Sequence, residues 1–352
     1  MNRTLRIAAL ATGAAAALAV AAPAMASYTP RLAVSHKTVS KAGNHPTTIH
    51  VTMPAADDPT ARIQILVPPG YSLSPKAPGT VIGSGTGDVL ARDQGLTLPL
   101  TGPVTEADPA AHATDACDPK AHVAVWVLTL SVAGQGLALP VYVDQTSGAA
   151  AAIASYIITV CFTPPDTPQG SPNRAPNGAQ PLDANFTVGT MTLPASLSAT
   201  PWRGFFTPYV PLKGIPNAAG TVEARSFVGI PGSVSLRGAF VRITNVYRLA
   251  GRVTEGGTPV AGAKVRIYRG RTINGLSQTG SLTVGANGAY GRKGKLVPRR
   301  TTYFQTRVTV PERDDAAGCS VALPPVASPA PPCVTATRGG FSAFSNILRF
   351  KP

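Results

Sequence analysis

The chain is poor in charged and aromatic residues, which make up 13% and 6% of its 352 residues. It holds only five histidines, and because the last of them is His122, the second half has no imidazole for general acid–base catalysis. No Gly-x-Ser-x-Gly motif is present, and the glycine-rich segment 83–87 lacks the lysine and the following helix of a phosphate-binding loop. We therefore expect a non-catalytic protein without a cofactor or a metal centre, in which segment 83–87 is a turn or a bulge.

Long helices are not expected either, because 35 prolines and 35 glycines interrupt the chain. Between these breaks, apolar and polar residues alternate with the period of two that is typical of strands. The strongest examples are residues 122–130, which include Trp126, and residues 155–162. Since 44% of the residues are apolar, enough to fill a core, the composition predicts an ordered all-β protein.

The first 26 residues have the organisation of an export signal. Arg3 and Arg6 precede an apolar stretch over 7–22, and Ala24-Met25-Ala26 has the small residues of a signal-peptidase site. The stretch is rich in alanine and ends at a proline, which is not typical of a transmembrane anchor. No cysteine follows the site and no apolar tail ends the sequence. We therefore predict a secreted, extracellular protein, either released or held non-covalently at the cell surface.

Four cysteines in an exported chain favour two disulfides. They can pair in three ways, and the local pairs Cys117–Cys161 and Cys319–Cys333 are the most economical. The second pair would close a loop around the proline-rich segment 323–332, which cannot build a core of its own. Closing a loop of about 15 residues stabilises a fold by roughly 3 kcal/mol through the unfolded state.

The formal charge of +15 is unevenly distributed. Residues 27–200 hold 8 Lys and Arg against 11 Asp and Glu, whereas residues 201–352 hold 21 against 5. A basic second half favours an anionic partner, and outside the cell we expect an anionic cell-envelope polymer or polysaccharide and no specific nucleic acid. A solvated basic face without a dedicated ligand fits the charge equally well. The residues predicted to bind the polymer are Lys264, Arg266, Arg269, Arg292, Lys293, Lys295, Arg299 and Arg300.

The spacing of strands and breaks divides the mature chain into two tandem β-sandwich domains. Residues 27–247 are expected to form an immunoglobulin-like sandwich, in which residues 163–184 are a Pro/Gly-rich insertion or linker. The strands over 185–247 either complete this domain, which we favour, or form a small middle unit. Residues 248–352 are expected to form the second domain. Nothing in the sequence predicts an oligomeric state.

Residues 249–291 carry the most informative pattern: a strand, a Gly-Gly turn, a Pro-Val-Ala-Gly-Ala corner, a second strand and an Asn-Gly hairpin. The pattern resembles the carboxypeptidase-regulatory-like, or transthyretin-like, β-sandwich module of secreted bacterial proteins. The matching residues are Gly251, Val253, Gly257, Pro259, Val260, Gly262, Ala263, Val265, Asn287, Gly288 and Tyr290. The resemblance implies an accessory, stalk, adhesin or carbohydrate-associated module. It implies no peptidase activity, because the catalytic zinc of those carboxypeptidases lies in another domain.

A carbohydrate-binding protein is the first alternative. Four aromatic residues lie close together in the sequence, and such side chains can stack on sugars. Aromatic residues at this density more often fill the junction between domains. The four residues are Trp202, Phe205, Phe206 and Tyr209.

A secreted metal-binding protein is the second alternative. Residues 112–122 contain four side chains that can ligate a metal, but their spacing matches no established ligand pattern. These residues are His112, Asp115, Asp118 and His122. Three further histidines, His36, His45 and His50, are expected to be exposed.

Overall fold

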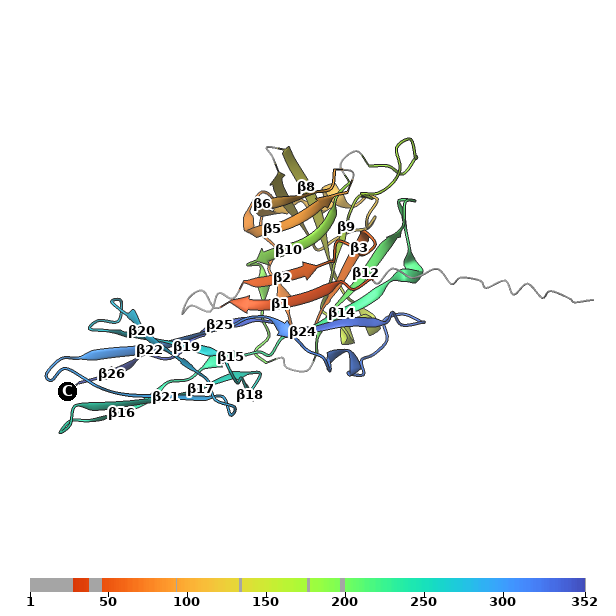
Figure 1. The fold of residues 1–352 in the computed structure, drawn as a ribbon. Coiled ribbons are helices and arrows are strands. Elements are labelled where there is room, and N and C mark those ends of the chain that lie inside the picture. The colour runs from red at the N-terminus through yellow and green to blue at the C-terminus, as the bar shows by residue number, and fades with distance from the viewer. Residues whose placement is uncertain are drawn as a thin grey trace, which may run out of the picture.

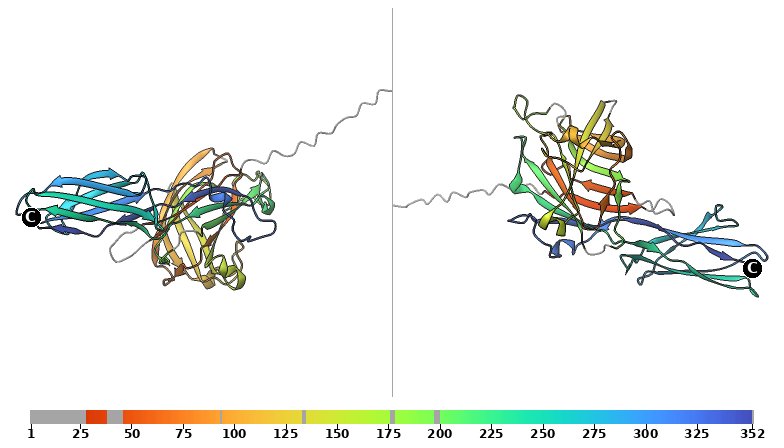
Figure 2. Two further views of the ribbon diagram at one scale, coloured as in Figure 1. Left: turned by 90° about the horizontal axis from the view of Figure 1, so that it is seen from below. Right: turned by 180° about the vertical axis from the view of Figure 1, so that it is seen from behind.

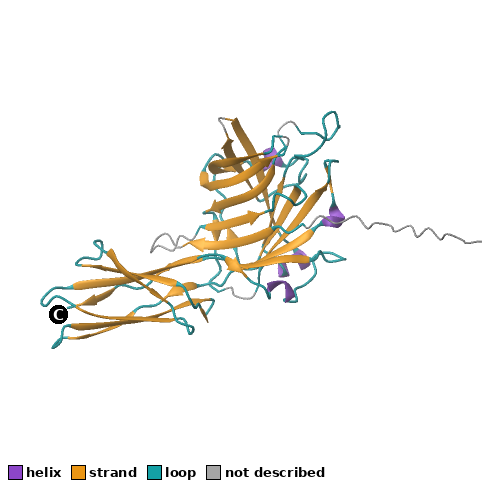
Figure 3. Cartoon of the chain, in the orientation of Figure 1, coloured by secondary structure: helices purple, strands orange, loops and turns teal. Residues whose placement is uncertain are grey.

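The chain folds almost entirely into strands joined by turns (Figure 3). The computed structural model describes residues 28–37, 46–92, 94–132, 135–175, 178–196 and 200–351. In these residues the helices are single 3-10 turns: η1 (Pro109–His112), η2 (Gly148–Ala152), η3 (Ala218–Gly220) and η4 (Gly318–Ser320). The all-β prediction is confirmed. The signal peptide predicted over residues 1–26 and His45 lie outside the described residues.

The first lobe is built on one long, curled sheet around a hydrophobic cluster (Figure 1). Each strand pairs with the next, antiparallel except in the last pair. The order is β1 (Arg31–Lys37), β2 (Thr47–Thr52), β10 (Gln180–Val188), β5 (Val81–Ala91), β6 (Leu96–Ala107), β7 (Ala124–Val132), β8 (Gln135–Gln145), β9 (Tyr156–Cys161), β3 (Thr60–Val67), β12 (Trp202–Val210), β14 (Val222–Phe227) and β24 (Cys333–Arg338). Two short pairings flank it: β4 (Ser72–Leu73) with β11 (Met191–Thr192), and β13 (Ile215–Pro216) with β12.

The two ends of this sheet lie side by side. On β24, the hydroxyls of Thr335 and Thr337 donate hydrogen bonds of 2.7 and 2.6 Å to the main-chain oxygens of Pro30 and Leu32. The sheet therefore folds back on itself and encloses its apolar face (Figure 2). Period-two alternation fills that face, since buried residues alternate with half-buried ones along β2 and β3.

Segment 83–87 is part of β5, so the prediction of a turn is wrong. The alternative, a bulge, fits better, because the pairing of β5 with β6 shifts register between Val81 and Gly83. A Cβ atom at Gly83 would lie 1.7 Å from the main-chain oxygen of Thr187, and one at Gly87 would lie 2.3 Å from that of Asp183. The glycines are thus required by the close approach of β5 to β10.

The second lobe is formed by two sheets on either side of a second hydrophobic cluster. Phe304 lies at its centre, with ring centroids 4.8 Å from Tyr247 and 5.8 Å from Phe350. One sheet contains β15 (Gly232–Val234), β16 (Arg237–Val241), β17 (Val246–Glu255), β18 (Thr258–Pro259) and β21 (Ala289–Lys295). The other contains β20 (Ser277–Thr283), β19 (Lys264–Gly270), β22 (Thr302–Val310), β25 (Phe341–Phe344) and β26 (Leu348–Phe350), and it continues into the long sheet of the first lobe, because β25 pairs in parallel with β1.

The chain passes between the lobes more than once. The second cluster begins with Val234, and the boundary predicted between residues 247 and 248 falls inside β17. After β22 the chain returns to the first lobe, where β23 (Arg313–Asp314) pairs with β24, and then enters the second lobe again at β25. The segment 163–184, predicted to be an insertion or linker, runs into β10, which begins at Gln180.

Ionic contacts hold the lobes together at this junction. Glu312, in the returning segment, lies 2.7 Å from Arg31 of β1 and 3.0 Å from Nδ1 of His50 on β2. Nε2 of His50 lies 2.9 Å from Asp183 of β10. The hydrogen bonds to Glu312 and Asp183 raise the pKa of His50, and those from His50 and Arg31 lower the pKa of Glu312.

His36, His45 and His50 were expected to be exposed. For His36 and His50, the two of these that the structure describes, this prediction is wrong. His36 is 5% exposed, and its Nε2 lies 2.8 Å from the hydroxyl of Tyr71. The side chain of His50 is 18% exposed between its two carboxylate partners. Both partners of His50 are distant in the sequence, so only the fold brings them together.

A buried ionic triad attaches the disulfide loop to the first lobe. Glu223 on β14 lies 2.7 Å from Arg203 of β12 and 2.9 Å from Arg225, and all three side chains are less than a tenth exposed. Burial would raise the pKa of Glu223, but the two arginines outweigh it and hold that pKa below its ordinary value. The guanidinium groups also donate hydrogen bonds to main-chain oxygens of the loop, namely those of Gly318, Cys319, Val321 and Pro324.

We expect Glu223→Gln to lower the free energy of unfolding of the first lobe by about 3–5 kcal/mol, because it leaves two buried guanidinium groups without their counter-charge. Urea unfolding followed by tryptophan fluorescence measures this, since both tryptophans lie in the first lobe. Glu106→Gln is the matched control, because Glu106 is equally buried and burial raises the pKa of its carboxyl group. Replacing this carboxyl group with an amide should therefore lower the free energy of unfolding by less than Glu223→Gln does. Equal losses in the two variants would contradict the role of the triad.

The junction contacts make stability depend on pH. The pKa of His50 is raised in the folded protein, so His50 contributes its full stabilisation below its unfolded-state pKa of 6.5. This stabilisation is lost as the pH rises through the folded-state pKa. The pKa of Glu312 is lowered in the folded protein, so Glu312 contributes its full stabilisation above its unfolded-state pKa of 4.5. This stabilisation is lost as the pH falls through the folded-state pKa. We expect the junction to be strongest between these two pH values. Urea midpoints of the wild type and His50→Gln should differ most in that window, and Lys213→Gln, which replaces an exposed lysine of the first lobe, should show no such maximum.

Candidate functional site

The second lobe is almost free of acidic residues. Residues 231–310 and 341–351 hold 16 Lys and Arg and a single acid, Glu255. Glu255 is buried, and its carboxylate lies 2.6 Å from Arg313 and accepts a hydrogen bond from the N–H of Gly229. The cations on the outer faces of this lobe form no ion pair with any carboxylate of the described residues.

The outer surface of the β16–β17–β21 sheet is one cationic face, which we call face one. Directly opposed residues of antiparallel strands point to the same side, and Arg248 is opposed to Lys293. Tyr247 and Leu249, which alternate with Arg248 on β17, are buried in the core, so Arg248 points outward. The same register places five exposed cations on face one: Arg237, Arg248, Arg252, Lys293 and Lys295.

The outer surface of the β19–β20–β22–β25 sheet is a second cationic face, face two. The guanidinium carbon of Arg307 lies 4.1 Å from the ring centroid of Tyr268 and 5.0 Å from that of Phe344. Arg266 is opposed to Arg307, and Lys264 lies two residues before it on the same side of β19. Face two therefore combines cations with partly exposed aromatic rings, an arrangement that cation–π attraction holds in place.

The eight residues predicted to bind a polymer do not form one surface. Lys293 and Lys295 lie on face one, and Lys264 and Arg266 lie on face two. The remaining four are on neither face. Arg269 lies over the inward-facing ring of Phe304; Arg292 points toward Gly280, where a Cβ would lie 2.2 Å from its Nη1; Arg299 and Arg300 are exposed in the loop before β22.

Four cations of faces one and two escaped the sequence prediction: Arg237, Arg248, Arg252 and Arg307. A signal for two of them exists, because Arg248 and Arg252 alternate with buried residues along β17. Arg307 also lies between buried residues of its strand, but its position between two aromatic rings depends on strands 39 and 37 residues away in the sequence.

The aromatic residues of the carbohydrate alternative do not form a stacking surface. Trp202 and Phe206 are fully buried, and Phe205 and Tyr209 are 7% and 6% exposed. All four lie on β12, which is covered on both sides. The rings of Tyr268 and Phe344 on face two are partly exposed and lie within reach of a ligand.

The loop of the metal alternative divides into two groups. His112 pairs with Asp115, whose carboxylate also accepts the hydroxyl of Tyr142. Asp118 and His122 instead meet Asp144 of β8, which the sequence analysis missed, and the three offer ligand atoms within 4.8 Å of one another. The ammonium of Lys120 lies 3.1 Å from Asp118 and 3.0 Å from Asp144. A cation of the protein itself therefore offsets part of the negative charge of this cluster.

Disulfides join Cys117 to Cys161 and Cys319 to Cys333, as the local pairing predicted. The first links the loop before β7 to the end of β9. The second closes the proline-rich loop whose carbonyls Arg203 and Arg225 hold. The two arginines were not predicted from the sequence, because their contacts with the loop are long-range.

We expect Lys120→Met to bind Zn²⁺ at least about tenfold more tightly than the wild type, because two carboxylates and an imidazole then lack their cation. Isothermal titration with zinc chloride measures the change. Lys76→Met, which removes an exposed lysine elsewhere in the first lobe, is the control and should leave zinc binding unchanged. Equal zinc affinity in all three proteins would contradict this prediction.

None of the helices among the described residues is long and apolar enough to cross a membrane. The resemblance of residues 249–291 to the carboxypeptidase-regulatory-like module stays a prediction. No protein-family model and no curated protein matches the sequence, so the function has to be argued from the two cationic faces themselves.

Proposed function

We propose that the protein is a secreted, non-catalytic binding protein that associates with an anionic polysaccharide or other anionic polymer of the cell envelope through its second lobe. The observation that carries this proposal is the composition of faces one and two, which together present cations on both sides of the lobe and no acid. Two disulfides support an oxidising, extracellular compartment.

The spacing of the cations suits a polymer. Neighbouring strands lie about 4.8 Å apart and alternate residues on one strand about 6.8 Å apart, so each face is a grid of charges at that spacing. A chain with one acidic group per repeating unit can contact several of them at once. Such contacts are weak singly, additive along a polymer and screened by salt. The rings of Tyr268 and Phe344 beside Arg307 favour a polysaccharide over a polyphosphate, since sugars stack on aromatic faces.

We also propose that the two lobes are two β-sandwich domains, and that the second is of the carboxypeptidase-regulatory-like type. Its backbone supports the resemblance at the matched positions: Gly257, Gly262 and Gly288 have φ values of 84°, 74° and 77°, which favour glycine. In this proposal the second domain begins near Gly232 rather than at residue 248, and β24 belongs to the first.

We expect the wild type to bind heparin, used as a soluble acidic polysaccharide, and to bind neutral dextran far more weakly. Removing two cations from one face, in Arg248→Ser/Lys293→Ser or in Arg266→Ser/Arg307→Ser, should weaken heparin binding about tenfold to thirtyfold, at roughly 1 kcal/mol for each cation. Affinity should fall as salt rises. Isothermal titration at two salt concentrations measures both effects.

The matched control is Lys76→Ser/Lys213→Ser, which removes two exposed lysines from the first lobe. This control variant has the same net charge as the two face variants. If net charge alone determined heparin binding, all three variants would lose the same affinity for heparin. Equal losses, or no saturable heparin binding by the wild type at low salt, would sink the proposal.

A further inference from the structure

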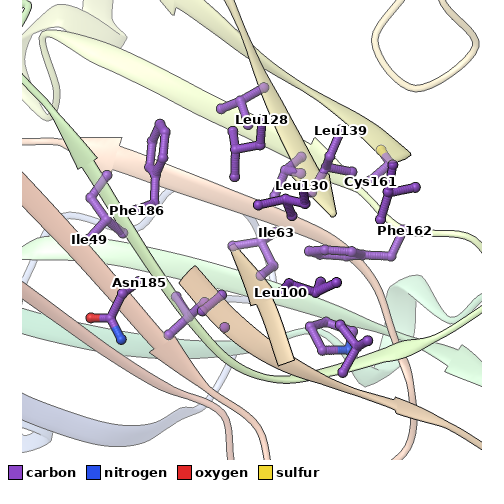
Figure 4. A pocket seen from close by; sticks show the side chains of 18 of the residues that line it. Ile49, Ile63, Leu100, Leu128, Leu130, Leu139, Cys161, Phe162, Asn185 and Phe186 are labelled. Carbon is purple, nitrogen blue, oxygen red and sulfur yellow. The ribbon is translucent and has the colours of Figure 1, made fainter. Parts of the chain in front are cut away.

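An apolar cavity of about 300 Å³ lies inside the first lobe, between the two layers of its curled sheet (Figure 4). Strands β2, β3 and β5 to β10 all contribute to its walls. Figure 4 shows the side chains of Ile63, Leu128, Leu130 and Phe162 gathered around a common space. These walls come from strands far apart in the sequence, so the cavity belongs to the fold and not to a single loop.

Small residues on two neighbouring strands, with a third small residue on β8, leave this space unfilled. β5 contributes Gly87 and β10 contributes Ala184, while Ala138 lies on β8. At Gly85 of β5, a Cβ would already lie 3.4 Å from Leu128 and Leu130. Interiors of proteins are normally packed without voids larger than a water molecule, and an apolar void attracts no water. A cavity of this size is within the range of small-molecule binding sites.

The charges around the cavity define what it can hold. No lysine or arginine lines it within the described residues, and Asp183 is its one ionisable side chain there. The carboxylate of Asp183 is paired with His50, on the side of β10 opposite to Phe186, which is buried. A carboxylate or phosphate group would find no counter-charge inside, and a peptide would leave its polar groups without partners.

The lining reaches solvent on β8. Leu137 is 43% exposed and Ala138 is exposed, whereas Val141 farther along the same strand is buried. An exposed leucine beside an apolar cavity offers a continuous apolar path from solvent to the interior.

We propose that the first lobe binds one uncharged hydrocarbon chain, of acyl or isoprenoid type, in this cavity, with access past Leu137. The binding is independent of the anionic polymer proposed for the second lobe, because the cavity contains no cation and lies wholly within the first lobe. The chain would replace solvent or void by apolar contacts along its whole length.

The test uses the purified full-length mature chain and the uncharged fluorescent probe N-phenyl-1-naphthylamine. We expect saturable binding at one probe per chain, and displacement by 1-decanol at least tenfold more effective than by decanoate at pH 8. Two variants fill the cavity from opposite walls, Val89→Trp on β5 and Leu139→Trp on β8. Each should weaken probe binding at least tenfold. Val241→Trp, at a half-exposed position of the second lobe, is the matched control and should leave probe binding unchanged.

Absence of saturable binding by the wild type overturns the proposal, as does unweakened binding in both filled variants. Displacement by decanoate as effective as by 1-decanol overturns the assignment of an uncharged chain. Circular dichroism checks that each variant folds. Should neither filled variant fold, the melting temperature of the wild type decides: 1-decanol should raise it, and an unchanged value counts against the cavity.

Discussion

The arrangement of the whole molecule depends on the charge of one buried residue, Glu223. Its carboxylate neutralises Arg203 and Arg225, and the same two guanidinium groups hold the carbonyls of the disulfide loop. The N–H of Glu223 also donates to the carbonyl of Pro332, at the point where that loop enters β24. β24 pairs with β14, its threonines bond to the main chain beside β1, and the chain then leads into β25 of the second lobe. A buried ion pair stabilises less than apolar packing of the same volume, but it fixes the position of its partners, since a misplaced partner leaves a charge unpaired.

The five acidic residues of the second half all form ion pairs. Glu223 lies in the triad, Glu255 is paired with Arg313, Glu312 with Arg31 and His50, and Asp315 with Arg338, while Asp314 meets Arg31. Each of these contacts lies in the first lobe or at the junction. The outer faces of the second lobe are left with cations alone. The unequal charge of the two halves is therefore a consequence of structure: acids are placed where the lobes meet, and the rest of the second lobe carries no carboxylate that would compete with an anionic ligand.

What could be read from the sequence depended on local pattern. Alternation of apolar and polar residues was sufficient for the all-β class, as in β2 and β3, and short sequence separation was sufficient for both disulfides. Long-range contacts could not be read in this way. His50 was expected to be exposed because its partners, Asp183 and Glu312, are 133 and 262 residues away. Asp144 joined the cluster of Asp118 and His122 only through the pairing of β7 with β8. The eight basic residues were grouped by proximity in sequence, whereas the chain crosses from one sheet to the other between β20 and β21 and crosses back between β21 and β22.

The same limit explains why the cavity left no trace in the sequence. Lining strands such as β2 and β3 have the alternation of ordinary half-buried strands, and the signal of a void is a deficit of volume summed over eight strands. Segment 83–87 was the nearest clue, but its glycines have two roles that sequence does not separate. Gly83 and Gly87 permit the close approach of β10, whereas a Cβ at Gly85 would contact Leu128 and Leu130. A strand that must lie close to its neighbour cannot also carry large side chains at those glycine positions. The close approach of β5 to β10 thus keeps large side chains out of the cavity at Gly87. It couples the shape of the first lobe to its capacity for an apolar ligand.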